Sequence, residues 1–304
     1  MVPPHGNNRP IFILGIMQRS GTNYFRDLLA LHPHCTSPDL FFEDNLTRYS
    51  SLLFDYAARV RKSWEVNRKI REGAEEDLLR YLGEGLLLFL KSEVPENQRV
   101  LVKTPRVENL PHFFKLFPRA DLLILIRDGR ALVESGMKGF GWNFDEAAHK
   151  WAEAAQTILN FDQAMKGTSC RYLIVKYEDL VTEAEKEMRR VLNFLELSEA
   201  EYNFEAARRL PVRGSSLFRG EKDHVHWDPL QKKSEFEPLQ RWRDWGPFRR
   251  ARFNWVAGDG LRRFGYKKEI SPQDFGWQVW NRILDGLWLI QRILRSFLGR
   301  LLHG

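Results

Sequence analysis

Short apolar runs alternate with helical patterns along most of this chain, and that alternation constrains its fold more than any other feature. The runs 11–14, 100–102, 122–126 and 172–175 are typical of buried strands. Helical periodicity at 21–31, 128–138 and 145–165 separates them, and residues 182–185 have the pattern of a capping box that begins a helix through about Leu195. The sequence therefore predicts an α/β fold, a P-loop-like parallel sheet flanked by helices.

Composition and charge exclude several classes of protein. With 304 residues, 43% hydrophobic and 29% charged, the chain is long enough and apolar enough to bury a core. Two cysteines, Cys35 and Cys170, give neither a disulfide framework nor a zinc spacing. No apolar stretch reaches the ~18–20 residues that span a bilayer. We expect a cytoplasmic protein, with peripheral membrane association as the variant.

The net charge of +7, with a pI near 9.4, favours anionic ligands. Lysine and arginine are spread along the chain instead of forming one basic arm, so we expect no nucleic-acid partner. Because ligands of parallel α/β sheets bind beyond the carboxyl ends of the strands, the polar clusters 19–23, 103–104 and 127–129 are predicted to share one edge.

The first cluster is a candidate phosphate loop. The strand 11–14 passes through Gly15 into Arg19, Ser20, Gly21 and Thr22, and then into a helix. Backbone N–H groups at such a helix start surround an anion, and the arginine and the hydroxyls add donors. In the frame of the nucleotide-kinase P-loop, Ser20 replaces the second glycine and Gly21 replaces the lysine. An ordinary strand-to-helix turn is the alternative, and a P-loop kinase is the alternative enzyme.

Residues 18–22, QRSGT, followed by a helix that ends in LHP at 31–33, resemble the 5′-phosphosulfate loop of sulfotransferases that use 3′-phosphoadenosine 5′-phosphosulfate (PAPS). The resemblance is to the bacterial and protein-tyrosine branches of that family. It implies in-line transfer of a sulfuryl group from PAPS to a hydroxyl acceptor, which could be carbohydrate, lipid-linked or peptide tyrosine. The residues it assigns to the donor here are Arg19, Ser20, Gly21, Thr22 and Asn23.

The second cluster matches the family's 3′-phosphate site. Arg127 ends an apolar run, and Ser135 follows eight residues later, about two helical turns on. An arginine and a hydroxyl so placed can hold one phosphate, although Arg127 could instead pair with Asp128. Tyr177 opens a segment similar to the family's Tyr-Glu-x-Leu turn. The resemblance covers about 9–267, which we expect to be the sulfotransferase domain, with 268–304 as a C-terminal amphipathic extension.

Sulfuryl transfer requires a base for the acceptor hydroxyl and cations for the leaving group. Arg19 and Lys103 are the expected cations, and the resemblance implies that Lys103 contacts the bridging or sulfuryl oxygens. It also points to a glutamate after the first helix as base. Glu43 occupies a comparable place, with Asp39 and Asp44 as rivals. Since the sulfuryl group carries one negative charge, we expect no metal.

Three later residues are assigned by resemblance to the closing segment of the family. Ser215 is a catalytic candidate and Ser216 a donor contact, and a local turn contact is the alternative for both. Arg241 stands where the related branch has a lysine on the cofactor. Its alternative is an ion pair beside Trp242.

Residues 275–302 form a different pattern, a wide apolar arc with three tryptophans and a narrower basic face. Packing on the parent domain, oligomerisation and binding at a membrane surface all remain open for such a helix. The alternative to an enzyme is a catalytically silent peripheral membrane or partner-binding module that kept the fold.

Overall fold

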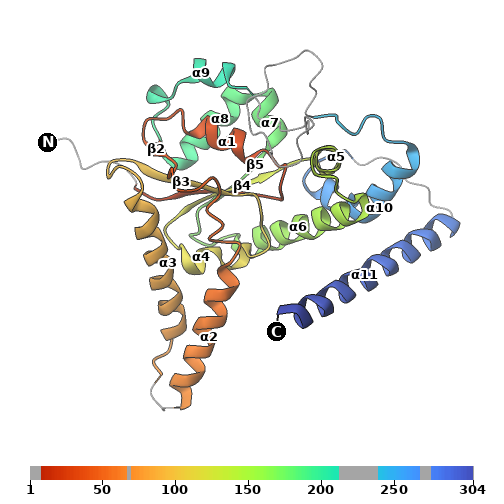
Figure 1. Cartoon of the computed structure of the whole chain (residues 1–304). Coiled ribbons are helices and arrows are strands. Elements are labelled where there is room, and N and C mark those ends of the chain that lie inside the picture. The colour runs from red at the N-terminus through yellow and green to blue at the C-terminus, as the bar shows by residue number, and fades with distance from the viewer. Residues whose placement is uncertain (1–7, 67–69, 212–238, 268–274, 304) are drawn as a thin grey trace. The chain divides into compact units, whose positions relative to one another are not determined.

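A computed structural model of the protein describes residues 8–66, 70–211, 239–267 and 275–303, with side chains through residue 294 (Figure 1). The chain forms two compact units. The first, called the sheet unit, comprises Met1–Arg127 and Ala154–Phe236. The second, called the helical unit, comprises Asp128–Glu153 and Glu237–Gly304.

A five-stranded parallel sheet forms the centre of the sheet unit. Its strands are β1 (Ile11–Gly15), β2 (Cys35–Thr36), β3 (Arg99–Thr104), β4 (Asp121–Ile126) and β5 (Tyr172–Lys176), in the order β2-β3-β1-β4-β5. Strands β1, β3 and β4 are buried along their whole length, as continuous apolar runs in a parallel sheet require. The four predicted strands are confirmed. β2 was not predicted, because a strand of two residues is too short to show a hydrophobic pattern.

The strand register brings the carboxyl ends of the strands to one edge. Leu14 of β1 pairs with Thr104 of β3, and Gly15 pairs with Leu125 of β4. The loop after β1, Lys103 near the end of β3 and Arg127 after β4 therefore share this edge, as the sequence predicted.

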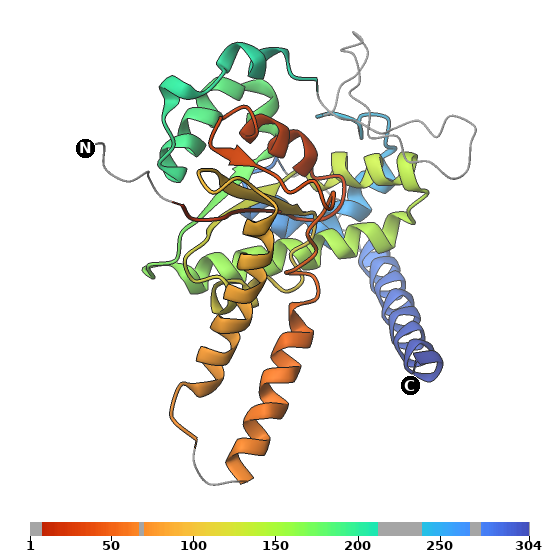
Figure 2. The same ribbon diagram turned by 60° about the vertical axis from the view of Figure 1, so that its left-hand side comes forward.

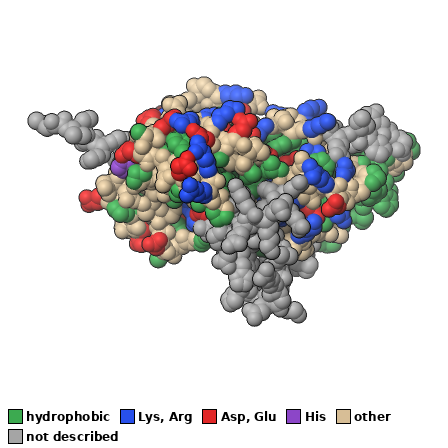
Figure 3. Space-filling view, turned by 90° about the horizontal axis from the view of Figure 1, so that it is seen from above, with side chains coloured by type: hydrophobic (Ala, Val, Ile, Leu, Met, Phe, Trp, Pro, Cys, Tyr) green, Lys and Arg blue, Asp and Glu red, His purple; other side chains and the backbone are tan. Residues whose placement is uncertain are grey.

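Helices cover both faces of the sheet (Figures 1 and 2). On one side lie α1 (Thr22–Leu29) and α8 (Ala184–Leu195), and on the other α3 (Ala74–Ser92) and α4 (Phe113–Leu116). The remaining short elements of this unit are the 3-10 turns Leu110–His112 and Glu199–Glu201 and the helices α7 (Tyr177–Thr182) and α9 (Phe204–Arg209). On the face that carries α8 and α9, acidic and basic side chains are interspersed (Figure 3), as in the ion pairs of Arg189 and Arg208 with Glu185.

Residues 50–66 and 74–92, for which the sequence predicted no structure, form a pair of helices. α2 (Ser50–Val66) and α3 lie side by side and project from the sheet (Figures 1 and 2). Gly83 of α3 packs so closely on α4 that an added Cβ would lie 1.9 Å from the carbonyl oxygen of Leu116. A glycine at this crossing therefore fixes the base of the helix pair.

The predicted capping box at 182–185 is wrong. Thr182 is the last residue of α7, and its hydroxyl donates back to the carbonyl of Glu178 (3.0 Å). Glu183 is the N-cap of α8 and makes no side-chain cap. A hydroxyl committed to the preceding turn cannot also cap the next helix.

The helical unit contains α5 (Gly129–Phe140), the first turns of α6 (Phe144–Met165), α10 (Pro247–Arg263) and α11 (Phe275–His303). Gly129 starts α5 against the rings of Trp151 and Phe253, which an added Cβ would approach to 2.6–2.7 Å. Within the described part of the chain, none of the helices has the length and apolar character that crossing a bilayer requires.

Candidate active site

The loop between β1 and α1 is wound tightly at the edge of the sheet. Gly21, the N-cap of α1, has φ +101°, a left-handed conformation suited to glycine, and Arg19 has φ +73°. A Cβ on Gly15 would lie 2.2 Å from the Ser20 hydroxyl, so glycine is needed there too. A non-glycine residue with positive φ is uncommon, and such backbones cluster at functional sites.

Two polar atoms in this loop are buried without a hydrogen-bond partner in the described part of the chain. They are the Ser20 hydroxyl and the Asn23 side-chain oxygen. Ser20 is fully buried and Thr22 nearly so. Buried polar atoms are usually hydrogen-bonded, because leaving one unpaired costs about 1–3 kcal/mol. The Ser20 hydroxyl can donate to an anion at the N-terminus of α1, so the loop has the donors of an anion site.

Lys103 and Glu43 face each other beside the loop. The ammonium of Lys103, whose residue is 2% exposed, lies 3.5 Å from the Glu43 carboxylate and 4.0 Å from the ring centroid of Phe42. Burial lowers the pKa of Lys103 to about 8, although Glu43 acts in the opposite direction. The Glu43 side chain stays 26% exposed, within reach of an incoming molecule.

Asp44 has a structural position, unlike its neighbour Glu43. Its carboxylate accepts from the Thr104 hydroxyl (3.0 Å) and from the Leu46 N–H (2.9 Å), and its own N–H donates to the Lys103 carbonyl (3.3 Å). Desolvation raises the pKa of the Asp44 carboxyl, while these donors act against that rise. Asp44 therefore fastens the segment that carries Glu43 to the end of β3. Asp39, the other rival, is exposed.

Arg127 reaches the loop between β1 and α1 from the end of β4. Its guanidinium donates to the carbonyl of Arg19 (2.6 Å) and lies 4.3 Å from the ring centroid of Tyr177. That ring also packs on Gly21, where an added Cβ would lie 2.3 Å from it. Tyr177 is 2% exposed. The loop is therefore supported by residues from the ends of β4 and β5.

The helical unit carries Ser135 and Arg241, and a guanidinium N–H of Arg241 donates to the Ser135 hydroxyl (3.1 Å). Ser135 lies on α5 and is 1% exposed. The N-cap of this helix is Asp128, whose carboxylate accepts from the Arg130 backbone N–H (2.9 Å) and from the Arg130 guanidinium (3.0 and 2.6 Å). The ring of Trp242 lies beneath Arg130 at 4.0 Å. Asp128 therefore caps the N-terminus of α5, and the Arg130 side chain fixes its carboxylate.

Comparison with known proteins decides the family. Residues 10–201 match the model of the sulfotransferase family. The chain belongs to that family.

Similar curated proteins are sulfotransferases as well. Protein-tyrosine sulfotransferase 1 of Danio rerio is 26% identical over 283 residues, covering 90% of this chain and 76% of that protein. Protein-tyrosine sulfotransferase A of Caenorhabditis elegans is also 26% identical, covering 89% of this chain and 71% of that protein. This sulfotransferase is therefore an enzyme that transfers a sulfuryl group from PAPS to a hydroxyl acceptor, as expected.

Solved structures share the fold. The sulfotransferase domain of the Synechococcus PCC 7002 olefin synthase superposes with a TM-score of 0.55 at 22% identity, covering 88% of this chain and 98% of that one. The sulfotransferase domain from the curacin biosynthetic pathway gives 0.52 at 18% identity, covering 86% and 99%. These matches confirm the predicted α/β sulfotransferase fold.

Arg26 and Phe42 lie near Lys103 and were not among the predicted site residues. Arg26 lies one turn along α1 from Asn23, and its guanidinium carbon is 5.2 Å from the ring centroid of Phe42. The Lys103 ammonium contacts the same ring. The positive charge of Arg26 lowers the pKa of Lys103 further. The spacing of Asn23 and Arg26 at i and i+3 put both on one helical face and could have identified Arg26.

The structure describes most of the other predicted residues. Ser215 and Ser216 lie outside the described residues, so their expected contacts stay predictions. Asn23 and Thr22 start α1, and Arg19 belongs to the loop itself.

Proposed function

We propose that this sulfotransferase transfers the sulfuryl group to the phenolic hydroxyl of tyrosine in a peptide or protein, with Glu43 as base and Lys103 as principal cation. The juxtaposition of these two side chains, 3.5 Å apart beside the phosphate loop, is the observation that carries the proposal. The similarity to protein-tyrosine sulfotransferases over about 90% of the chain supports the choice of acceptor.

The loop residues fit an anionic donor. The Ser20 hydroxyl and the N–H groups that open α1 supply donors for the 5′-phosphosulfate, and Gly21 lets the backbone approach it. Arg127 and Ser135 remain our candidates for the 3′-phosphate, with Arg241 beside Ser135. Tyr177 is proposed to act through position, because its ring supports Gly21 and Arg127. When bound, PAPS supplies an activated sulfuryl group whose bond to the phosphate oxygen breaks as the acceptor oxygen attacks sulfur.

Lys103 and Glu43 have complementary tasks in this reaction. The Lys103 ammonium stabilises negative charge that develops on the leaving oxygen, and its burial strengthens the effect by excluding water. Arg19 is proposed to assist it. The Glu43 carboxylate accepts the proton of the tyrosine hydroxyl as the oxygen–sulfur bond forms. Because Glu43 is partly exposed whereas Asp44 is bonded on several sides, Glu43 is the carboxylate that an acceptor can reach.

Nothing in this scheme requires a metal ion. The cations that we assign to the donor are side chains, and the sulfuryl group carries one negative charge. The proposal that no metal takes part is tested by assaying the enzyme with a chelator present, where undiminished transfer is expected.

The acceptor is tested with three peptides that differ at one position. A peptide with a single tyrosine, its phenylalanine counterpart and its serine counterpart are each incubated with the enzyme and ³⁵S-labelled PAPS. We expect label on the tyrosine peptide alone, recovered as sulfotyrosine. Transfer to a sugar or a lipid headgroup but to none of the peptides would refute the tyrosine assignment and leave the family activity intact.

The base is tested by Glu43→Gln with Glu108→Gln as matched control. Glu108 is an exposed carboxylate that pairs with Arg106, two residues away (3.0 Å). Removing a general base lowers kcat by about 10²–10⁴-fold. We expect that loss for Glu43→Gln with unchanged affinity for 3′-phosphoadenosine 5′-phosphate, and no loss for the control. A kcat within the range of the control would exclude Glu43 as the base.

A further inference from the structure

The C-terminal helix α11 is held to the helical unit by polar side chains. Arg252 of α10, which is 1% exposed, donates to Asn281 (2.9 Å) and pairs with Asp285 (2.8 Å). The indole N–H of Trp255 also donates to Asp285 (2.8 Å), and His149 of α6 lies 3.3 Å from the same carboxylate. We call these residues the polar seam.

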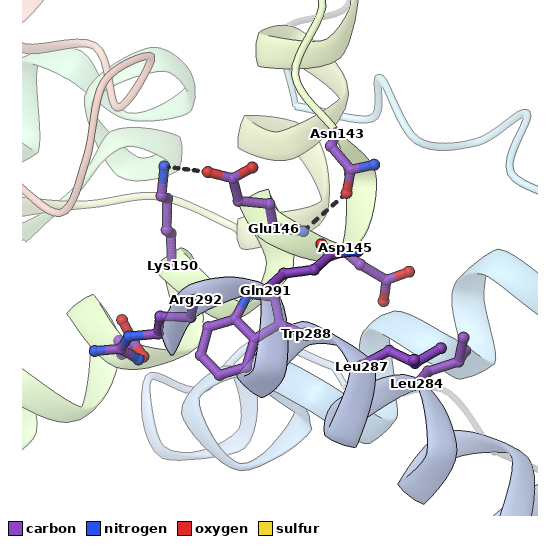
Figure 4. Close-up of a pocket in the computed structure, with 10 residues that line it drawn as sticks. Asn143, Asp145, Glu146, Lys150, Leu284, Leu287, Trp288, Gln291 and Arg292 are labelled. Carbon is purple, nitrogen blue, oxygen red and sulfur yellow. Dashed lines mark hydrogen bonds and ion pairs between the residues drawn. The ribbon is translucent and has the colours of Figure 1, made fainter. Parts of the chain in front are cut away.

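Ring contacts and a salt bridge extend this attachment along α6. Trp288 stacks on His149, with ring centroids 4.1 Å apart and planes 12° apart. Figure 4 shows the Trp288 side chain directed toward α6, where Asp145 and Lys150 line the same pocket. Arg292 pairs with Glu153 one turn further along. Because directional contacts are made at positions 281, 285, 288 and 292, the rotation of α11 about its own axis is fixed.

This rotation leaves the apolar side of α11 facing outward. The side chains concerned include Trp280, Ile283, Ile290, Ile293 and Leu294, each between 47% and 59% exposed. At about 100° per residue they span an arc of about 140° opposite the polar seam. Between residues 275 and 294 that arc contains no charged residue. A helix that only packed on its own domain would turn this side inward and the polar side to water.

A bilayer surface explains the arc better than a second copy of the helix does. Helix pairs bury a narrow stripe at two positions in seven, whereas this arc is too wide and convex for one partner helix to cover. Arg282 is exposed at one border and Trp280 at the other, as is typical of helices at the lipid–water boundary. Apart from Arg292, which pairs with Glu153, residues 275–303 contain three arginines, and their positive charge complements anionic headgroups.

We infer that α11 docks the enzyme on an anionic phospholipid bilayer, lying in the plane of the interface with its apolar arc in the lipid. This inference is independent of the acceptor. The polar seam then has a second role, because it keeps the apolar side chains of α11 facing solvent in the protein that is not yet bound to lipid. In-plane binding of this kind combines apolar burial with attraction to anionic lipid.

The test is flotation of the full chain with vesicles of phosphatidylcholine alone or with phosphatidylglycerol added. We expect binding to the anionic vesicles that weakens at high salt. Ile283→Asp with Ile290→Asp should lower the partition coefficient by about tenfold for each side chain removed from lipid. The matched control is Leu52→Asp with Leu88→Asp, two side chains of α2 and α3 that are 64% and 69% exposed. This control variant should bind the anionic vesicles as well as the wild type does.

Both double variants replace exposed side chains, so unchanged thermal unfolding and unchanged binding of 3′-phosphoadenosine 5′-phosphate verify their fold. Light scattering without vesicles measures the oligomeric state of the same samples. If the wild type does not bind anionic vesicles, the inference is overturned. It is also overturned if the two double variants lose vesicle binding to the same extent. A dimer in solution that Ile283→Asp with Ile290→Asp dissociates, together with no vesicle binding, would assign the arc to a second copy instead.

Discussion

Replacing Lys103 by methionine should stabilise the donor-free protein while it removes activity. Methionine keeps an unbranched chain of similar length, so the packing around β3 is retained. The substitution removes a charge from a site that is 2% exposed and leaves Glu43, which is partly exposed, in contact with water. A buried cation held for function is expected to cost stability.

The size of this effect follows from the pKa of Lys103. Burial lowers it from 10.5 to about 8, and at about 1.36 kcal/mol for each tenfold change this corresponds to roughly 3 kcal/mol. Between pH 8 and 10.5 the unfolded chain binds more protons at this residue than the folded one, so the stability of the wild type rises with pH there. The cost of the buried ammonium is complete below pH 8 and vanishes above 10.5.

Urea unfolding of the wild type and of Lys103→Met, at about pH 7 and about pH 10, measures this difference. We expect the variant to be more stable by an amount on the order of 3 kcal/mol at the lower pH, and the gap to narrow at the higher one. Sulfuryl transfer should fall by about 10²–10³-fold, as on removal of a group that stabilises developing charge. A variant less stable than the wild type at the lower pH would refute the reasoning, because the pair with Glu43 would then outweigh the burial cost.

Three further predictions concern the loop between β1 and α1 and the neighbouring Lys103. Gly21→Ala should destabilise the protein by at least ~1 kcal/mol and weaken binding of 3′-phosphoadenosine 5′-phosphate, because φ is +101° and the Tyr177 ring fills the space. The control Gly85→Ala, in an open helical position, should stabilise it slightly by thermal unfolding. Ser20→Ala should leave stability unchanged or higher but reduce affinity for the same ligand by about tenfold in calorimetry, and equal affinity would contradict a donor role. Affinity should fall as pH rises through about 8, where Lys103 loses its charge, and Lys103→Arg should flatten that profile.

Much of the fold could be predicted because it depends on local patterns. Four apolar runs fixed four strands, and periodicity located the helices that became α1, α5 and α6. The polar clusters after β1, β3 and β4 were predicted to share one edge because parallel strands end on the same side. The pairing of β1 with β3 and β4 confirms this prediction. The pairing of α2 with α3 was not predicted, since the position of α3 depends on the contact between Gly83 and α4. The capping box failed because a hydroxyl has two competing turns within reach, and the sequence does not rank them.

The sequence by itself predicted the turn between β1 and α1, because the positive φ of Gly21 and the close contact of Gly15 with Ser20 and Thr22 are requirements of nearby residues in the chain. Only the tertiary structure separated Glu43 from Asp44. Adjacent carboxylates are chemically alike, and what distinguishes them is that Thr104 binds one while Lys103 faces the other. The tertiary structure was also needed for α11, although the sequence already showed its amphipathic pattern. Which side faces outward was decided by Arg252, a residue of another helix, since a buried guanidinium must find its acceptors.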